Sequence, residues 1–409
     1  MTTTVLYVLN DSVGGATQGV VELLRGMAGD PRYRAIVVSP REPAPARRAE
    51  IEALCDELHV VPMAWWNSKV GLPAWYRPIQ WARTGTRTGF HSVPVGRLAR
   101  LIRSRQVDLV YTNTAVILDG ALAARVTGRP HLWHVKEWMG RGARTRFLLP
   151  DRALVHTMGD RLSSRVVAMT EFIAEVFRRE GANGMVRVIY DGVDVARFEG
   201  PAGGQELRRE LGIERDQLLI AMAAALRSPW KKHELFVAMA GRLADRLPEA
   251  RFVIFGPPPR QFRNPAYRAG WEHYRRLVEV ARSAGITDRL SIGVFCADIP
   301  RMMEAVDVLV HPCDVEPFGR VAIEAMAARR PVVGPWRGGI AESIVDGETG
   351  LLVRPDDVDA FAEATTALAA DADLRTRMGE AGRSRAGAVF SLERHVGEMT
   401  RLYEEVLAG

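Results

Sequence analysis

The sequence predicts an α/β protein made of two doubly wound halves, each a parallel sheet covered by helices on both faces. Short apolar runs that suit buried strands alternate with helical stretches through the first half of the chain, and the alternation restarts near residue 218. Continuous apolar strands separated by helices are typical of parallel sheets buried on both sides. A length of 409 residues also suits two domains.

The first half contains six strand-like runs with helical stretches between them. The run VLYVLN (5–10) is followed by Gly14-Gly15, which opens the amphipathic stretch GVVELLRGMA. The remaining runs are 35–40, 58–63, 107–113, 130–135 and 165–170, and the clearest helical stretches between them are 94–105 and 117–128. Sheets of this kind bind ligands at the carboxyl ends of their strands.

The second half repeats the pattern. Its strand-like runs are 218–226, 251–256, 290–295, 306–312, 330–335 and 350–355. The segment 190–204 is rich in Gly and turn-forming residues and predicts a hinge, and 391–408 is a long helical pattern. We therefore expect an N-terminal domain over 1–190 and a second domain over 191–390.

Composition excludes several classes of protein. Hydrophobic residues make up 47% and charged residues 25%, which are ordinary globular values and exclude a wholly disordered chain. No apolar run reaches 18 residues, so a membrane-spanning helix is not expected. The N-terminus lacks a basic region and reads as a strand rather than a signal peptide. Three widely spaced cysteines fit a reducing compartment and exclude a disulfide scaffold. These features predict a cytoplasmic protein.

Charge is spread unevenly along the chain. Residues 1–190 hold 26 Lys and Arg against 16 Asp and Glu, a net charge of +10, whereas 191–409 hold 29 against 33, a net charge of −4. A basic half attracts an anionic acceptor, an anionic membrane face or nucleic acid, or it is simply a solvated Arg-rich surface. No helix-turn-helix or RNA-stacking signature is present, so nucleic acid is not expected.

The block 311–355 carries the strongest chemical signal. A strand ends near His311, a loop with Pro312, Pro317 and Gly319 follows, and a helix begins near Arg320. A helix N-terminus offers unpaired N–H groups and suits an anion. Glu316 in the loop and Glu324 on the helix can both face one ligand, and a carboxylate suits paired sugar hydroxyls. Either glutamate alone also fits an exposed residue on an ordinary helix.

The string EPFGRVAIE, from Glu316 to Glu324, resembles the E-x7-E signature of the retaining nucleotide-sugar glycosyltransferases with the GT-B fold, the fourth family. The following GG…E…DGETGLLV stretch also resembles that family. VIYDGVDVARF (188–198) is similar to its interdomain NGVD segment, with Asp191 where Asn usually stands. The ending FSLERH…LYEEVL resembles the helix that returns to the N-terminal domain. The resemblance implies a GT-B fold, two Rossmann-like domains that face each other across a cleft.

The resemblance assigns roles in the second domain, which would bind the donor. Glu324 would bind the nucleotide ribose, and Glu316 would hold the donor sugar together with the backbone of Phe318 and Gly319. Lys231, in RSPWKKHELF, would neutralise the departing diphosphate, because a fixed cation stabilises the charge that a leaving group gains. The same two segments supply further donor-binding candidates, namely Arg227, Lys232, Pro317 and Arg320. The family places an arginine some five residues before this lysine, and here it is displaced to Arg227. Taken alone, 227–232 also fits a basic loop at a helix start.

The first domain, which includes the returning helix 391–409, would bind the acceptor, and two of its segments carry further candidate residues. VLNDSVGGATQG (8–19) resembles the family's Gly-rich first loop, in which Gly14 and Gly15 let the backbone approach the donor phosphate. Without that context the pair fits a plain tight turn and not a dinucleotide fingerprint. In WHVKEW (133–138), His134 resembles the family's histidine near the donor sugar, and Glu137 would orient it or touch the acceptor. A lone histidine at a strand end also fits a structural role.

The stretch 65–90 combines four of the nine tryptophans with basic residues. Trp66 and Trp75 are candidate acceptor contacts, because aromatic faces stack on sugars or rest on a membrane interface. The alternative is a loop packed on its own aromatics.

The resemblance implies transfer of a sugar from a UDP- or GDP-sugar to an acceptor hydroxyl with retained anomeric configuration, by a front-face mechanism with no metal or other cofactor. No Asp-x-Asp, HExxH or G-x-S-x-G pattern stands out. The acceptor stays open between a glycan, a lipid-linked glycan and a small-molecule aglycone, and so does peripheral contact with an anionic inner membrane face. Two alternatives are a nucleotide-sugar epimerase of the same fold and a non-catalytic nucleotide-sugar-binding partner.

Overall fold

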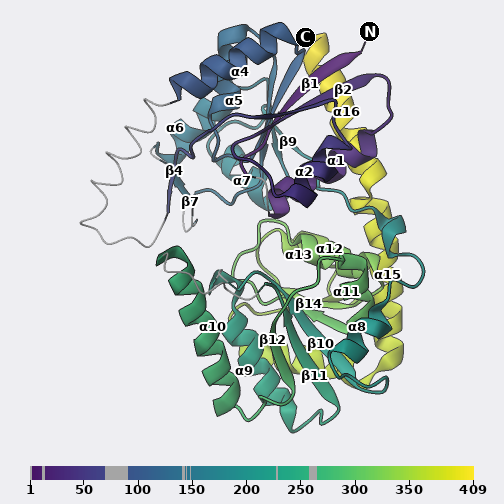
Figure 1. Ribbon diagram of the computed structural model, residues 1–409. Coiled ribbons are helices and arrows are strands. Elements are labelled where there is room, and N and C mark those ends of the chain that lie inside the picture. Colours follow the sequence, from purple (N-terminus) through teal and green to yellow (C-terminus); the bar gives the residue numbers. More distant parts are fainter. Residues whose placement is uncertain are drawn as a thin grey trace. The chain divides into compact units, whose positions relative to one another are not determined.

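The computed structural model describes residues 2–11, 14–69, 91–140, 143, 145–147, 149–226, 229–257 and 265–409. The chain divides into two compact units (Figure 1). Unit 1 comprises Met1–Gly192 and Leu392–Gly409, and unit 2 comprises Val193–Ser391. The sequence-based division, after residue 190 and at residue 391, lies within two residues of these bounds.

Unit 1 is built on a parallel sheet of seven strands. Their order is β3-β2-β1-β5-β6-β8-β9, and every neighbouring pair is parallel. The strands are β1 (Thr3–Val8), β2 (Tyr33–Ser39), β3 (Glu57–Val60), β5 (Leu109–Asn113), β6 (His131–Val135), β8 (Arg165–Ala168) and β9 (Val186–Val188). A two-stranded antiparallel ribbon of β4 (Asn67–Lys69) and β7 (Thr145–Phe147) lies outside this sheet.

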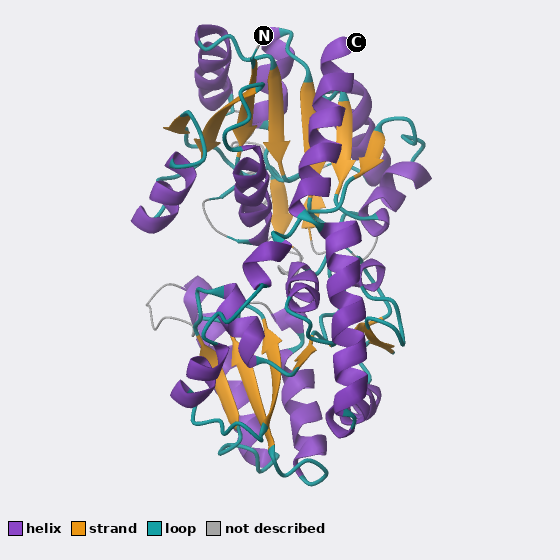
Figure 2. Ribbon diagram, turned by 90° about the vertical axis from the view of Figure 1, so that its right-hand side faces the viewer, coloured by secondary structure: helices purple, strands orange, loops and turns teal. Residues whose placement is uncertain are grey.

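Helices cover both faces of the unit 1 sheet, as the apolar strands predict (Figures 1 and 2). Val5 and Tyr7 pack against α1 and α16, while Leu6 and Val8 face α4 and α5. The alternation along one strand shows that each face has its own apolar core. The helices of unit 1 are α1 (Gly15–Met27), α2 (Pro45–Glu52), α4 (Ser92–Ser104), α5 (Asp119–Thr127), α6 (Asp151–His156), α7 (Glu171–Arg179) and α16 (Leu392–Ala408), with a π-helical turn η2 (Thr157–Arg161).

Unit 2 repeats this architecture with six parallel strands in the order β12-β11-β10-β13-β14-β15. The strands are β10 (Leu218–Ala223), β11 (Ala250–Phe255), β12 (Leu290–Val294), β13 (Val308–Val310), β14 (Val332–Pro335) and β15 (Gly350–Val353). Its helices are η3 (Val195–Phe198), α8 (Gly204–Glu210), η4 (Pro229–Lys231), α9 (His233–Ala244), α10 (Pro265–Ser283), α11 (Ile299–Ala305), α12 (Arg320–Ala327), α13 (Ile340–Ser343), α14 (Val358–Ala370) and α15 (Ala372–Phe390). Helices of both units begin with side-chain caps, for example from Thr170, Asp298, Asp357 and Asp371.

The prediction of two doubly wound parallel sheets is confirmed. Every strand-like run named in the sequence overlaps an observed strand. Three strands were not predicted, namely β4, β7 and β9. Each has only three residues and carries polar or charged side chains, so none forms the apolar run that marks a buried strand.

Each sheet has one point at which the chain reverses its direction of travel across the sheet. In unit 1 this point lies between β1 and β5, and in unit 2 between β10 and β13. Ligands of open α/β sheets bind at the carboxyl ends of the strands on either side of such a point. The loops after these four strands contain most of the residues singled out in the sequence, which gives those residues a common place in each unit.

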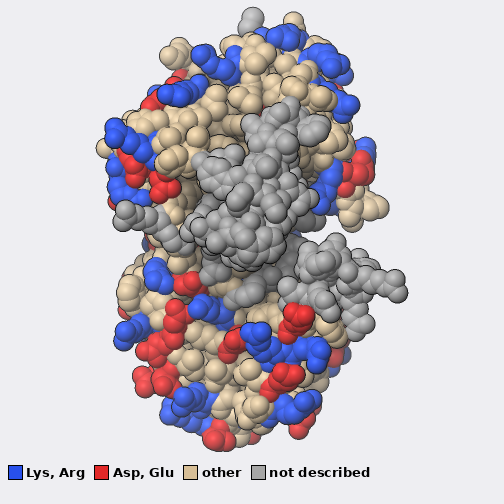
Figure 3. Space-filling model, turned by 90° about the vertical axis from the view of Figure 1, so that its left-hand side faces the viewer, with Lys and Arg blue, Asp and Glu red and all other residues tan. Residues whose placement is uncertain are grey.

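Charged side chains of both signs are interspersed on the face shown in Figure 3. Several basic residues of unit 1 are paired locally, for example Arg25 with Glu22 and Arg34 with Glu57. Its net positive charge is therefore partly offset where these pairs form. Among the described residues, no helix has both the length and the apolar character needed to cross a membrane.

Candidate active site

The carboxyl edge of the unit 2 sheet brings together the two loops that were predicted to carry chemistry. One loop follows β10 and leads through η4 into α9, and the other follows β13 and leads into α12. Because β10 and β13 are neighbours in the sheet, Lys231 and Glu316 meet although they are 85 positions apart in the sequence.

Glu316 lies between a lysine and a histidine. The Lys231 Nζ donates to Oε2 of Glu316, and Nε2 of His311 lies 3.1 Å from the same oxygen. The side chains of Lys231 and Glu316 are 21% and 14% exposed, so the pair is shielded from bulk water but still reachable. We refer to Lys231, His311 and Glu316 as the Glu316 cluster.

The charges of the Glu316 cluster are fixed by its own members. Burial alone raises the pKa of Glu316, but the charge of Lys231 and the hydrogen bond from His311 outweigh burial and hold this pKa well below its usual range. Burial lowers the pKa of Lys231, and the Glu316 carboxylate more than offsets that effect. Burial lowers the pKa of His311. The cluster is therefore an ammonium–carboxylate pair beside a neutral imidazole.

His311, Cys313 and Glu316 also have the chemistry of metal ligands. One potential ligand atom from each lies within 4.8 Å of the others, and an imidazole, a thiolate and a carboxylate suit a zinc ion. However, the Lys231 ammonium already contacts the carboxylate. It would repel a second cation at that distance. The three side chains therefore suit a contact with the Lys231 ammonium better than the binding of a divalent metal ion.

Two glycines hold the backbone of Glu316 in place. The N–H of Gly339 donates to the Glu316 carbonyl oxygen at 2.7 Å. Gly338 has φ +86°, and a Cβ on it would lie 2.7 Å from the same oxygen. Only glycine fits there, so the GG pair seen in the sequence block acts as a backbone support for Glu316.

The start of α12 holds the next group of predicted donor residues. Gly319 caps the helix with φ +85°, and Arg320 Nε donates to Oε1 of Glu324 one turn later at 3.0 Å. The Phe318 ring is buried edge-on against Phe390 at 6.0 Å. Pro317, between Glu316 and Phe318, is half-buried.

The two other cations predicted near Lys231 differ from it. The Lys232 ammonium lies 2.7 Å from Asp356, so the structure ties it to the turn after β15 rather than to Glu316. Lys232 also adopts a left-handed backbone conformation at the start of α9, with φ +58°. Arg227 lies outside the described residues.

In unit 1, the Gly-rich loop leads directly into α1. Gly14 is its N-cap with φ +99°, and no atom of the described residues lies within 4 Å of a Cβ built on Gly14 or Gly15. The backbone there is open to a ligand. Asn113, at the end of β5, donates from Nδ2 to the Ala16 carbonyl at 3.1 Å and ties this helix start to the switch point of the sheet.

His134 is fully buried at the end of β6. Its Nδ1 lies within hydrogen-bond distance of the Tyr111 hydroxyl, and its Nε2 has no hydrogen-bond partner among the described residues. Burial first, and then the charge of Lys136, lowers the pKa of His134 well below its usual range. His134 is therefore a neutral imidazole with one nitrogen unused by the protein.

Comparison with known proteins identifies the family. Residues 13–197 match the model of "Glycosyltransferase Family 4", and residues 204–385 match that of "Glycosyl transferases group 1". The two matches together span nearly the whole chain. The chain belongs to the family 4 glycosyltransferases.

Curated relatives and solved structures agree with this assignment. The D-inositol 3-phosphate glycosyltransferase of Kribbella flavida is 34% identical over 206 residues, 48% of this chain and 45% of that protein. The enzyme of the same name from Salinispora arenicola is 28% identical over 76% of this chain and 77% of its own length. The chain thus spans about half of the first relative and three quarters of the second.

The solved structures share the fold. Anabaena Alr3699/HepE, in a crystal structure with UDP and glucose, has a TM-score of 0.77 at 20% identity, over 98% of this chain and 100% of that one. Sucrose-phosphate synthase from Thermosynechococcus elongatus has a TM-score of 0.73 at 19% identity, over 99% of both chains. The GT-B fold, the glycosyltransferase class and the resemblance stated from the sequence are confirmed. Neither the epimerase nor the non-catalytic alternative gains support from these matches.

Two of the residues that were predicted to contact the acceptor, Trp66 and Glu137, form contacts within unit 1 of this glycosyltransferase. The Trp66 side chain is buried, its Nε1 donates to the Ala115 carbonyl at 2.7 Å, and its ring packs against Trp133 and Phe147. Glu137 accepts from the N–H of Ala115 at 2.7 Å, and burial raises its pKa. The placement of Trp66 speaks against a direct acceptor contact, and the packed-aromatic alternative fits it better. Trp75 lies outside the described residues.

Unit 1 contains a buried histidine–carboxylate pair that no sequence motif indicates. His91, just before α4, places Nδ1 2.7 Å from Asp119 in the first turn of α5, and both side chains are buried. The two residues are 28 positions apart and belong to no motif, so only the packing of α4 on α5 reveals the pair.

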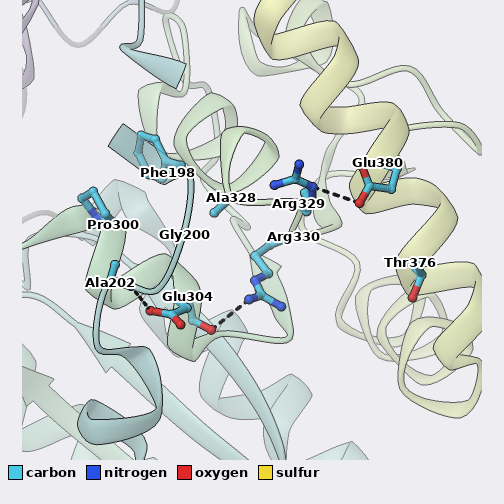
Figure 4. Close-up of a pocket in the computed structure, with 10 residues that line it drawn as sticks. All are labelled: Phe198, Gly200, Ala202, Pro300, Glu304, Ala328, Arg329, Arg330, Thr376 and Glu380. Carbon is cyan, nitrogen blue, oxygen red and sulfur yellow. Dashed lines mark hydrogen bonds and ion pairs between the residues drawn. The ribbon is translucent and has the colours of Figure 1, made fainter. Parts of the chain in front are cut away.

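A separate cavity of about 370 Å³ lies in unit 2 (Figure 4). Its charged groups are already engaged: Arg329 pairs with Glu380 at 2.9 Å, Arg330 donates to the Glu304 carbonyl at 3.0 Å, and the Glu304 carboxylate accepts from the Ala202 N–H. Arg330 and Glu304 precede β14 and β13, so this cavity lies at the amino edge of the sheet, opposite the Glu316 cluster.

Proposed function

We propose that this chain transfers a sugar from a nucleoside-diphosphate sugar to an acceptor hydroxyl with retention of anomeric configuration. Unit 2 would bind the donor and unit 1 the acceptor. The single observation that supports this most is the Lys231–Glu316 pair at the switch point of the unit 2 sheet. Membership of the family supplies the reaction class, and the pair supplies chemistry suited to it.

Lys231 would stabilise the leaving diphosphate. An ammonium has three donors, and Glu316 takes one of them. The pKa of Lys231 lies above its ordinary value because of Glu316, so the cation is present throughout the neutral range. As the glycosidic bond breaks, negative charge develops on the diphosphate, and a fixed cation at the correct position lowers the barrier. A preformed charge of this kind does the work that a divalent ion does in other transferases.

Glu316 would hold the donor sugar. Lys231 and His311 both contact Oε2, and a carboxylate accepts about four hydrogen bonds in total. Oε1 remains for a sugar hydroxyl. Gly338 and Gly339 fix the backbone of Glu316, so the carboxylate is positioned before the donor arrives.

Glu324 would bind the nucleotide ribose. Arg320 holds its Oε1 at 3.0 Å, and the pair is largely shielded from water. A carboxylate that is already oriented loses less conformational entropy when it accepts ribose hydroxyls. This role gives Arg320 a positioning function rather than a direct contact with phosphate.

The donor-site proposal is tested by thermal unfolding of the purified chain with UDP, GDP, dTDP, ADP or CMP, with and without EDTA. A ligand at 100 times its dissociation constant adds about 2.7 kcal/mol to the free energy of unfolding. We expect a selective rise with UDP or GDP that EDTA leaves unchanged. The Lys231→Ala variant should lose most of this rise, and the neighbouring Lys232→Ala variant is the matched control. A full panel without any rise would contradict the donor site.

The acceptor is tested with a matched pair of compounds. The two relatives compared above are named D-inositol 3-phosphate glycosyltransferase, and unit 1 is basic, so we propose an anionic polyol acceptor. D-inositol 3-phosphate and myo-inositol differ by the phosphate alone. Transfer to the first only, weakened by salt, would support an anionic acceptor. Equal transfer to both compounds, or transfer only to a glycan or a lipid-linked sugar, would contradict the proposal of an anionic polyol acceptor. Proton NMR of the first product reports the anomeric configuration.

A further inference from the structure

A buried ion pair in unit 1 has no part in the roles described so far. Lys136 Nζ lies 2.5 Å from Oδ1 of Asp191, and the two side chains are 3% and 4% exposed. Lys136 follows β6 and Asp191 follows β9, so the pair joins two of the segments that the sequence singled out. We refer to Lys136, Asp191 and His134 as the Asp191 cluster.

The third segment of unit 1 is built around the same pair. A Cβ placed on Gly19 would lie 2.7 Å from Oδ2 of Asp191 and 2.8 Å from Nζ of Lys136. Helix α1 therefore approaches the pair so closely that any side chain at this point would require the aspartate or the lysine to shift. The helix that follows the Gly-rich loop, the strand end that carries His134 and the turn that carries Asp191 are thus packed on one salt bridge.

His134 lies beside the pair but does not join it by a hydrogen bond. Its Nε2 is 3.8 Å from Oδ1 of Asp191, the same oxygen that Lys136 contacts. This distance is beyond a hydrogen bond. On its other side, Nδ1 faces the Tyr111 hydroxyl. Burial raises the pKa of Tyr111 well above its usual range, so the hydroxyl keeps its proton. The Asp191 carboxylate on the Nε2 side of the ring favours the tautomer that carries its proton on Nε2, in which the Tyr111 hydroxyl donates to Nδ1.

An Nε2–H that is buried without an acceptor is costly, and buried polar groups nearly always have a partner. The nearest carboxylate would be the natural acceptor if nothing else held it. Lys136 holds it instead and offsets its charge. His395, whose Nδ1 faces the Tyr190 carbonyl at 2.7 Å, places its ring 6.4 Å from that of His134.

We propose that Lys136 is a positioning residue that keeps the Asp191 carboxylate away from His134, so that the Nε2–H of His134 remains available to donate a hydrogen bond to bound substrate. This inference rests on the proposed function only for the identity of the substrate. The arrangement makes His134 a neutral hydrogen-bond donor rather than a general acid, because an imidazole without a charged partner keeps its proton through the reaction.

The proposal predicts a specific order among three variants. Lys136→Met leaves a buried carboxylate without its cation, and Asp191 then captures the Nε2–H of His134. We expect the kcat to fall by about 10- to 100-fold. Asp191→Asn removes the charge that Lys136 has to hold, so His134 stays neutral and the kcat should remain within about threefold of the parent, even though the protein is less stable. The double variant Lys136→Met/Asp191→Asn should recover about tenfold in kcat over Lys136→Met.

The protonation of His134 is followed separately by NMR of protein labelled at histidine Cε1, with His134→Asn to assign the signal. We expect no titration of His134 between pH 5 and 8 in the parent, Asp191→Asn or the double variant, and a titration in Lys136→Met. This arm needs no substrate, so it fails or succeeds independently of the proposed reaction. The kcat of each variant is compared with its urea unfolding free energy.

Two outcomes would overturn the proposal. If the double variant is as inactive as Lys136→Met, or the kcat of all three variants follows their stability, the pair has a structural role only. If Asp191→Asn loses activity as Lys136→Met does, Asp191 acts on His134 directly and Lys136 does not hold it away. If Lys136→Met does not fold, Asp191→Asn still tests the proposal. Its kcat should stay near that of the parent if Lys136 holds Asp191 away from His134, and should fall if Asp191 acts on His134 directly.

Discussion

Each unit contains a trio of a lysine, a histidine and a carboxylate, and the two trios differ in state. In unit 2, Glu316 binds Lys231 and lies 3.1 Å from His311, with side chains that a ligand can reach. In unit 1, Asp191 binds Lys136 but stays 3.8 Å from His134, and the pair is closed to water. The first trio presents a charged pair to a ligand, whereas the second uses a charged pair to leave a neutral donor unoccupied. An ion pair therefore has to be judged by its exposure and its neighbours rather than by its residue types.

The strongest test of this contrast removes the cation of unit 2. We expect Lys231→Ala to lower the kcat by about 10²- to 10³-fold, since a group that stabilises transition-state charge is worth about 2.7–4 kcal/mol. The affinity for the nucleoside diphosphate should fall less than the kcat, because the charge on the leaving group grows only as the bond breaks. Steady-state kinetics and binding of the diphosphate measure the two quantities.

Lys232→Ala is the matched control for that experiment. Lys232 is the next residue, has the same chemistry and is bound to Asp356 at 2.7 Å instead of Glu316. We expect its kcat to stay within about twofold of the parent, since an exposed ion pair contributes little. Equal losses in the two variants would mean that the positive charge of the loop matters and the contact with Glu316 does not.

Much of this contrast could be predicted from the sequence, but not all of it. The apolar runs predicted both sheets, and the E-x7-E block predicted that Glu316 and Glu324 lie at one helix start. Lys136 stands inside WHVKEW and Asp191 inside YDGVD, yet nothing in either string shows that they touch. Their contact depends on β6 and β9 ending at the same sheet edge and on the absence of a side chain at Gly19.

The role of Trp66 was also open in the sequence, because it depends on contacts with residues far away along the chain. An aromatic residue in a stretch rich in tryptophan and arginine suits an acceptor contact as well as a core. Only the hydrogen bond to Ala115 and the packing on Trp133 distinguish the two. Very short strands such as β9 are missed for a related reason, because their stability comes from neighbouring strands rather than from their own pattern.

Acid should affect both units through histidines that are buried as neutral groups. Burial lowers the pKa of His131 in unit 1 to about 3, and burial together with the charge of His273 lowers that of His233 in unit 2 to about 4. As the pH falls, each of these histidines takes up a proton near pH 6.5 in the unfolded chain, but only at a lower pH in the folded chain. The free energy of unfolding therefore falls as the pH drops below 6.5, by up to about 3 kcal/mol for His233 by pH 4.

The measurement is urea unfolding between pH 8 and 4 for the parent and His233→Asn. At pH 8 both forms are neutral at this position, so the difference there reports lost contacts only. A smaller acid loss in His233→Asn is the expected result. Parallel curves for the two proteins would show that residue 233 does not control the acid response.

Gly19→Ala tests how tightly α1 packs on the Lys136–Asp191 pair, and it changes no charged residue. The added methyl group would lie 2.7 Å from Asp191 and 2.8 Å from Lys136, so one of them must shift. We expect a loss of about 1–3 kcal/mol in the free energy of unfolding, as for other overpacked sites. Gly15→Ala in the same helix is the control, because no part of the described chain lies within 4 Å of its Cβ and its backbone is helical. A neutral effect at Gly19 would mean that the pair can separate easily.

The smallest expected effect concerns Glu324. Its carboxylate is held by Arg320 at 3.0 Å and would bind ribose hydroxyls that are present in both substrate and transition state. Uniform binding of this kind changes affinity rather than turnover. We therefore expect Glu324→Ala to weaken binding of the diphosphate about tenfold and to leave the kcat within about twofold. Glu380→Ala removes a glutamate that is likewise paired with an arginine, Arg329, but at the opposite edge of the sheet, and should change neither quantity. If Glu324→Ala lowered the kcat as Lys231→Ala does, the whole helix start, and not the Glu316 cluster alone, would respond to the charge that develops during transfer.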